Sequence, residues 1–194
     1  MVLVRTFGSA IRPLDAQPAL FLDRDGILNR RVSDGYVLDP DELVMLDGII
    51  PLLAEATSLG TPIVVVSNQG CISRALLTEE KLDAIHRLLL RHLAGVGVTV
   101  EAIYVCPHHP AAVDPADRSC DCRKPLPGLL LAAARDLALD LTRSLFMGDQ
   151  QSDRQAAEAA GITGGRFLLV DGEAVTAGLA GEFHRLLLRL RAPT

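Results

Sequence analysis

The sequence of 194 residues contains no tryptophan, and aromatic residues make up only 4% of it. Basic residues are also in the minority, with 19 Lys and Arg against 24 Asp and Glu, for a formal net charge of −5 at pH 7. Nucleic-acid-binding proteins usually present a basic surface and often aromatic side chains. The composition therefore argues against a nucleic acid partner and against a zinc-dependent nucleic-acid module.

Long apolar runs are absent as well. No segment approaches the roughly 20 consecutive apolar residues that a membrane-spanning helix needs. Near the start, a Val-Leu-Val run stands where a secretory signal would need about 7–15 apolar residues. We therefore expect a cytoplasmic protein without a membrane partner, with residues 1–18 as a flexible N-terminal lead-in.

The sequence also lacks internal repeats, low-complexity tracts and Gly/Ser-rich linkers. Hydrophobic residues make up 49% of the chain, enough to form one core without disulfide bonds. We expect a single domain over residues 19–194. The sequence does not define the oligomeric state, and a monomer is the working expectation.

Short apolar runs alternate with longer amphipathic stretches along the chain. The short runs end at polar residues or glycine, as buried strands do; they cover residues 19–22, 62–66, 102–105, 144–147 and 167–170. The longer stretches have helix caps or one-sided apolar patterns; they cover residues 48–59, 79–93, 127–139, 152–161 and 182–191. A capping box of Ser152 and Gln155 is expected to open the fourth. This alternation predicts an α/β fold, a doubly wound and mostly parallel sheet covered on both faces.

Polar side chains follow the predicted strands, where ligands bind in such sheets. They are Asp23, Asp25, Ser67, Asp149 and Asp153, and Lys124 stands just ahead of the third predicted helix. Clustered carboxylates repel one another unless a cation joins them, and oxygen ligands suit Mg²⁺. A lysine and a hydroxyl beside that metal make a site for a phosphoryl group. One carboxylate could be a nucleophile that forms an acyl phosphate, and another could transfer protons.

Each of these patterns has a simpler interpretation. A lone Asp-x-Asp pair is usually a solvated turn or a helix cap, a lone serine is usually a turn residue, and a lone lysine is usually a surface charge. These interpretations do not explain why all the groups fall at the ends of successive elements, where one crevice can use them. We therefore favour a functional site.

Four segments occur in a characteristic order. They are Phe-Leu-Asp23-Arg-Asp25-Gly, Val-Val-Val-Ser67-Asn-Gln, Arg123-Lys124-Pro-x-Pro-Gly and Met-Gly-Asp149-x-x-x-Asp153. They resemble the motifs of the haloacid dehalogenase (HAD) superfamily. The Asp34-Gly35-Tyr36 segment and the Cys-Pro-His-His-Pro segment suggest its histidinol-phosphatase-like branch. The resemblance implies a Rossmann-like core and phosphatase activity. The 43 residues between Asp23 and Ser67 leave no room for a separate cap domain, so none is expected.

The resemblance also implies roles for single residues. Asp23 would be the nucleophile and Asp25 the general acid and base, with Ser67 and Lys124 holding the phosphoryl oxygens. Mg²⁺ would bind the side chains of Asp23 and Asp149 and the backbone carbonyl of Asp25. The residues implied to meet the rest of the substrate are Asn68, Arg123, Asp34, Gly35, Tyr36 and Gln150.

The substrate that the resemblance implies is a phosphorylated sugar. The first candidate is the 7-phosphate of a D-glycero-D-manno-heptose 1,7-bisphosphate. The alternatives are histidinol phosphate and other sugar phosphates of the same branch. A phospho-accepting signalling domain, which also groups acids, a hydroxyl and a lysine on a doubly wound sheet, is the non-enzymatic alternative.

The four cysteines are not spaced like a disulfide set. Cys106 and His108, followed by Cys120 and Cys122, supply three thiolates and an imidazole, the ligands of a closed structural Zn²⁺ site. Zinc at this position would order the loop between the two pairs. The alternative is a set of reduced cysteines with a histidine in a polar loop.

The sequence gives weaker indications of a functional role for the remaining histidines and cysteine. His109 is the rival zinc ligand, although the resemblance favours its neighbour. Cys71 is expected to be a small packed residue near the substrate, and His86 on its helix is expected to be a solvated or helix-face residue rather than a ligand. Ile27 and Gln150 depart from the family pattern, which commonly has threonine and lysine at these positions.

Overall fold

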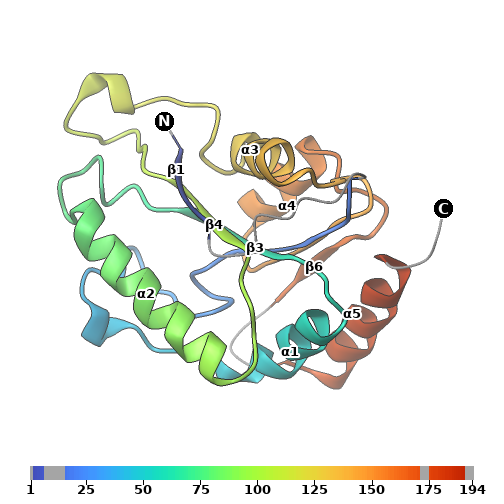
Figure 1. Cartoon of the computed structure of the whole chain (residues 1–194). Helices are drawn as coiled ribbons and strands as arrows, with labels where there is room; N and C mark the ends of the chain where they lie inside the picture. Colours follow the sequence, from blue (N-terminus) through green and yellow to red (C-terminus); the bar gives the residue numbers. More distant parts are fainter. Residues whose placement is uncertain (1, 7–15, 171–174, 191–194) are drawn as a thin grey trace.

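The computed structural model describes residues 2–6, 16–170 and 175–190. A six-stranded sheet runs through the molecule, with helices on both of its faces (Figure 1). In sheet order the strands are β1 (Leu3–Thr6), β4 (Ala102–Cys106), β3 (Ile63–Asn68), β2 (Leu20–Leu22), β5 (Leu145–Gly148) and β6 (Phe167–Leu169). Neighbouring strands are parallel except for β1, which pairs antiparallel with β4. The predicted α/β fold is confirmed.

The helices divide between the two faces of the sheet. On one face lie α1 (Ile50–Ser58), α2 (Glu79–Gly95) and α5 (Ala177–Leu190), and on the other lie α3 (Gly128–Leu137) and α4 (Gln151–Ala159). Three short 3-10 helices join them, η1 (Pro40–Glu42), η2 (Asp47–Ile49) and η3 (Pro115–Asp117). None of the helices in the described ranges is long and apolar enough to cross a membrane.

Side chains of the central strands alternate between two cores. On β3, Ile63 and Val65 pack under α1 and α2, whereas Val64 and Val66 pack under α3. A sheet covered on both faces buries every side chain of a central strand. This is why the strands are continuous apolar runs in the sequence.

The strand order defines the edge of the sheet at which a ligand is expected to bind. The chain passes from β2 to β3 and β4 on one side and then returns to β5 on the other side of β2. Ligands of open α/β sheets bind beyond the carboxyl ends of the strands at such a reversal. The loops after β2, β3 and β5 meet at this edge, and no separate cap domain covers it within the described ranges.

The segment expected to be a flexible lead-in over residues 1–18 contains a strand. Leu3–Thr6 pairs with β4 in the register Leu3 to Val105, and the side chain of Arg5 binds Asp83 on α2 at 3.0 Å. The Val-Leu-Val run was the signal for this strand, since valine favours extended structure. Residues 7–15 lie outside the described residues.

The fourth predicted helix begins differently from the expectation. Its capping box is formed by Gln150 and Asp153, not by Ser152 and Gln155. The carboxylate of Asp153 accepts the backbone N–H of Gln150 at 3.0 Å. The last helix begins at Ala177, earlier than predicted, and Arg191 lies outside the described residues.

Candidate active site

The loop after β2 carries Asp23 and Asp25 and passes close to the loop after β5. The amide N–H of Asp23 donates to the carbonyl oxygen of Met147 at 3.0 Å. Gly26 has a φ of +91°, and a Cβ atom there would lie 2.0 Å from a carboxylate oxygen of Asp149. Only glycine allows both this backbone conformation and this approach. The glycine therefore lets the two predicted carboxylates come close to Asp149.

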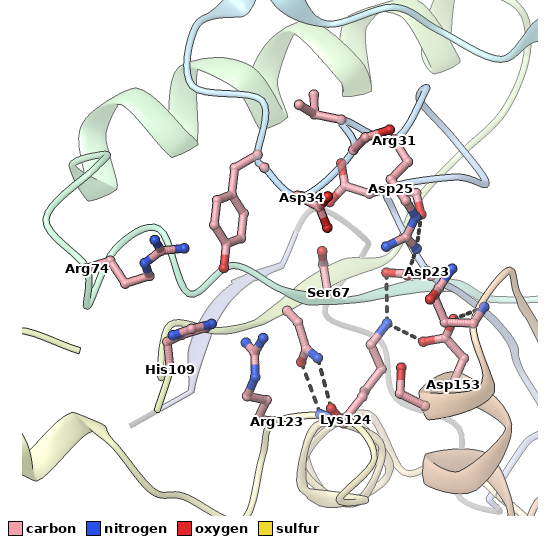
Figure 2. A pocket seen from close by; sticks show the side chains of 17 residues that line it. Asp23, Asp25, Arg31, Asp34, Ser67, Arg74, His109, Arg123, Lys124 and Asp153 are labelled. Carbon is pink, nitrogen blue, oxygen red and sulfur yellow. Dashed lines mark hydrogen bonds and ion pairs between the residues drawn. The ribbon is translucent and has the colours of Figure 1, made fainter. Parts of the chain in front are cut away.

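Lys124 lies between β4 and α3 and is almost completely buried. Its Nζ is 2.8 Å from Asp23, 2.7 Å from Asp153 and 3.0 Å from the carbonyl oxygen of Val66 (Figure 2). The side chain of Asn68 holds the lysine backbone through two hydrogen bonds of 3.0 Å. Asn68 was expected to meet the substrate, but its amide holds Lys124 in place. A substrate contact for it stays a prediction.

Asp23 has an unusual electrostatic environment. Burial raises its pKa, the ammonium of Lys124 lowers it, and the carboxylates of Asp153 and Asp25 raise it further, to about 7. Burial lowers the pKa of Lys124, but its two carboxylate partners outweigh this and the pKa is raised. Lys124 therefore stays charged. A second cation beside Asp23 would favour the carboxylate form.

The carboxylate of Asp25 is surrounded by donors. Arg24 donates from Nη2 at 2.8 and 3.0 Å, Asn29 at 2.8 Å, and Gln69 at 2.8 Å. Burial raises the pKa of Asp25, but the charge of Arg24 and these hydrogen bonds outweigh it, so the pKa is lowered. Gln69 also donates to the hydroxyl of Ser67 at 2.9 Å. This buried amide links two predicted site residues, a role that the sequence did not reveal.

Three oxygens surround the guanidinium group of Arg31 next to Asp23. The Nη2 atom of Arg31 lies 2.5 Å from Asp149, 3.1 Å from the carbonyl oxygen of Asp25 and 3.7 Å from the second carboxylate oxygen of Asp23. These are the three oxygens that the resemblance assigns to Mg²⁺. Because they already hold one positive group and are all hard ligands, they fit a divalent cation. Arg31 itself was not predicted.

Asp23, Asp25, Ser67, Lys124 and Asp153 line one open cavity of about 710 Å³. Arg74, His109 and Arg123 lie on the side opposite the Asp23 and Asp153 carboxylates (Figure 2). The predicted substrate-binding residues Asp34, Gly35, Tyr36, Asn68, Arg123 and Gln150 all line it. Its other side chains include Arg31, Arg74 and His109. No sequence pattern marked Arg31 or Arg74, and His109 was considered only as a rival zinc ligand.

The sulfur cluster lies at the end of β4. One ligand atom from each of Cys106, His108, Cys120 and Cys122 falls within 4.8 Å of the others. His108 Nδ1 is 3.2 Å from Cys122 Sγ and 3.6 Å from Cys106 Sγ. His109 points instead to the cavity.

The chemistry of the sulfur cluster suits a metal. Hydrogen bonding to Cys106 and burial raise the pKa of the Cys122 thiol. Burial lowers the pKa of His108 and favours its neutral form. Zinc binds neutral imidazole and thiolate. Because the thiol has a raised pKa, it becomes a thiolate only when a cation binds and displaces its proton. The four residues therefore fit a tetrahedral zinc ion.

Two buried residues do not line the cavity. His86 is a helix-face residue, one of the two alternatives expected for it, is 2% exposed, and has its Nε2 atom 3.3 Å from Nη1 of Arg24. Cys71 is buried in the core under the loop after β3, as expected. Burial raises the pKa of the Cys71 thiol to about 11, which makes it unreactive.

A family model described as HAD-hydrolase-like matches residues 121–180. This stretch includes Lys124 with α3 and β5 with Asp149. Together with the doubly wound sheet and the carboxylates at its carboxyl edge, the match defines the class of the protein, a hydrolase of the HAD superfamily.

Two relatives narrow this class. The chain is 43% identical over 161 residues to the D-glycero-beta-D-manno-heptose-1,7-bisphosphate 7-phosphatase of Yersinia pestis, with 82% of this chain and 84% of that relative covered. It is 41% identical over 160 residues to the Escherichia coli K12 enzyme of the same name, with 82% of each covered. The chain belongs to the family of D-glycero-beta-D-manno-heptose-1,7-bisphosphate 7-phosphatases.

A solved structure agrees with this membership. The D,D-heptose 1,7-bisphosphate phosphatase of B. bronchiseptica is 34% identical and superimposes with a TM-score of 0.73, covering 89% of this chain and 99% of that one. That protein was crystallised in complex with magnesium and phosphate. The similarity therefore extends over almost the whole fold.

Proposed function

We propose that this protein hydrolyses the 7-phosphate of D-glycero-D-manno-heptose 1,7-bisphosphate through an aspartyl phosphate on Asp23. The observation that carries the proposal is the position of Asp23, 2.8 Å from Lys124 and beside oxygens that hold a cationic group. The names of the relatives that are 41% and 43% identical support the substrate. Histidinol phosphate, other sugar phosphates and a phospho-accepting signalling role are the alternatives.

Mg²⁺ is the proposed cofactor. The side chains of Asp23 and Asp149 and the backbone carbonyl of Asp25 would hold it, and the magnesium in the B. bronchiseptica structure supports this choice. When bound, Mg²⁺ offsets charge on the phosphoryl oxygens and favours the ionised form of the nucleophile.

The first half of the reaction forms the covalent intermediate. A carboxylate oxygen of Asp23 attacks phosphorus, and the bond from phosphorus to the sugar oxygen breaks. The ammonium of Lys124 supplies positive charge for the phosphoryl oxygens. Because the hydroxyl oxygen of Ser67 accepts a hydrogen bond from Gln69, its own proton is available for another phosphoryl oxygen.

Asp25 transfers the protons. It protonates the leaving sugar oxygen, and then removes a proton from the water that hydrolyses the aspartyl phosphate. Its lowered pKa suits the second step, in which the carboxylate is the base. The first step uses the protonated form, which becomes more populated as the pH falls.

The mouth of the cavity suits a substrate with a second negative group. The guanidinium groups of Arg74 and Arg123 line it, and Arg74 lies over the ring of Tyr36 with 6.0 Å between its Cζ and the ring centroid. Arginines are well suited to phosphate oxygens. We propose that this side meets the remainder of the heptose bisphosphate, with Asp34, Gly35 and Gln150.

The sulfur cluster is proposed to hold a structural Zn²⁺ on Cys106, His108, Cys120 and Cys122. All four positions would be filled by the protein, so no place would be left for a reacting water. Its role would be to order the loop that leads to Lys124. A single domain over residues 19–194, a monomeric state and a cytoplasmic location also stay proposals.

A phosphate-release screen with Mg²⁺ tests the function. The substrates are D-glycero-D-manno-heptose 1,7-bisphosphate, the heptose 7-phosphate, and histidinol phosphate. We expect the highest kcat/KM on the bisphosphate, release of the 7-phosphate, and no turnover with a chelator. A preference for histidinol phosphate would support the first alternative, and no release from any ester would support the signalling role.

A further inference from the structure

Arg24 is the largest side chain that is fully buried in the described part of the chain. Its guanidinium always carries a charge, which is costly to bury without partners. The Nε and Nη2 atoms donate to the carboxylate of Asp25 at 2.8 to 3.2 Å. The remaining terminal nitrogen, Nη1, points away from Asp25 towards α2.

The partner of Nη1 is His86, with 3.3 Å between Nη1 and Nε2 of the imidazole. A guanidinium can only donate hydrogen bonds, so Nε2 must be the acceptor. The ring is therefore neutral, with its proton on Nδ1. His86 lies in the apolar stripe of α2 with Leu82 and Leu89, so no water replaces it easily.

The contacts form a continuous chain from the core to the site. His86 accepts from Nη1 of the guanidinium, and the Nε and Nη2 atoms donate to the two oxygens of the Asp25 carboxylate. With only one end held, the guanidinium could rotate towards other acceptors. The plane of the carboxylate would then no longer be fixed relative to Asp23.

We propose that His86 is a positioning residue for the reaction, which acts through Arg24 to aim the Asp25 carboxylate at the leaving oxygen. The inference rests on the proposed function, because it assigns the proton transfers to Asp25. Proton transfer depends strongly on geometry, whereas substrate binding uses other side chains. Loss of the acceptor should therefore lower kcat and leave KM nearly unchanged.

The kinetic test compares His86→Leu, which removes the acceptor, with His86→Gln, whose amide oxygen can accept from Arg24. We expect kcat to fall about tenfold or more in His86→Leu, with KM within about twofold, and to stay close to wild type in His86→Gln. Ile85→Val, a buried change next to it on α2, is the matched control. Equal kcat values in His86→Leu and His86→Gln would overturn the proposal.

Two additions keep the test decisive. If His86→Leu does not fold, His86→Asn replaces it, because the shorter side chain should not reach Nη1 and should lose kcat where His86→Gln keeps it. Ring nitrogen NMR of the wild type should show Nε2 unprotonated from about pH 5 to pH 8. A protonated Nε2 in that range would contradict the contact itself. If the wild type released no phosphate, the proposed function would fail while this spectrum still tested the contact.

Discussion

Two clusters of side chains that could hold a metal ion stand at the same edge of the sheet, and they differ in their access to solvent. In the oxygen cluster of Asp23, Asp149 and Asp153, Asp23 and Asp153 line a cavity of about 710 Å³, and Arg31 contacts Asp23 and Asp149. The sulfur cluster is closed, and three of its four members are buried. A cluster that faces a cavity can contact a substrate, whereas a closed cluster can only order the segments that carry its residues.

The two clusters are joined through one short segment. Cys122 is followed by Arg123 and Lys124, and Arg123 donates to the carbonyl oxygen of His108 at 3.1 Å. Lys124 then reaches Asp23. The connection predicts a division of labour, in which the sulfur cluster positions the lysine that the oxygen cluster uses.

The largest expected effect comes from Asp23→Asn in the oxygen cluster. An amide is a poor nucleophile, so phosphate release should fall by about 10³-fold or more. Zinc content should not change. Asp41→Asn, at an exposed position on η1, is the control and should keep full activity. Substantial Mg²⁺-dependent release by Asp23→Asn would show that another group attacks phosphorus.

Cys122→Ser tests the sulfur cluster. Loss of a thiolate should abolish stoichiometric zinc, measured by elemental analysis, and lower Tm by about 10 °C, because metal binding contributes to folding. Cys71→Ser, at a buried cysteine outside the cluster, should keep its zinc. The division of labour would be wrong if Cys122→Ser kept both its zinc and its Tm.

The pH dependence of Mg²⁺ binding should follow Asp23. Its pKa is raised to about 7, and the metal binds the carboxylate rather than the acid. Below this pKa a proton competes, so the affinity should fall by up to about tenfold per pH unit as the pH decreases, and level off above it. Calorimetric titrations across this range check the slope. A flat profile through pH 7 would show that Asp23 is not a ligand.

Arg31→Gln should have the smallest effect, and it should improve Mg²⁺ binding rather than impair a property of the protein. The guanidinium occupies the oxygens proposed for Mg²⁺, so its removal should tighten Mg²⁺ binding about fivefold. Arg74→Gln, in the same cavity but not on these oxygens, should leave the Mg²⁺ affinity unchanged. Weaker binding in Arg31→Gln would mean that the arginine does not compete with the metal.

The carboxylate and lysine positions could be predicted from the sequence because they depend on topology alone. Parallel strands bring their carboxyl ends together, so Asp23, Ser67 and Asp149 had to approach one another once the strands were recognised. The grouping of Cys106, His108, Cys120 and Cys122 could be predicted as well, since their spacing is short and their chemistry specific.

Other features depend on side-chain packing over long sequence separations. Arg31 reaches Asp149 from a loop, and Gln69 bridges Asp25 and Ser67, and no periodicity reports such contacts. His86 did carry a signal for its burial. It follows Leu82 by about one helical turn and therefore lies in the buried stripe of α2.

The central claim is that Asp23 carries the phosphoryl group during turnover. Rapid acid quenching of the wild type with the heptose bisphosphate and Mg²⁺, followed by peptide mass spectrometry, tests this directly. We predict a phosphoryl group on the peptide that contains Asp23, absent without Mg²⁺ and absent in Asp23→Asn. A phosphoryl group on a different peptide, or rapid phosphate release with no phosphorylated peptide at any quench time, would contradict the claim.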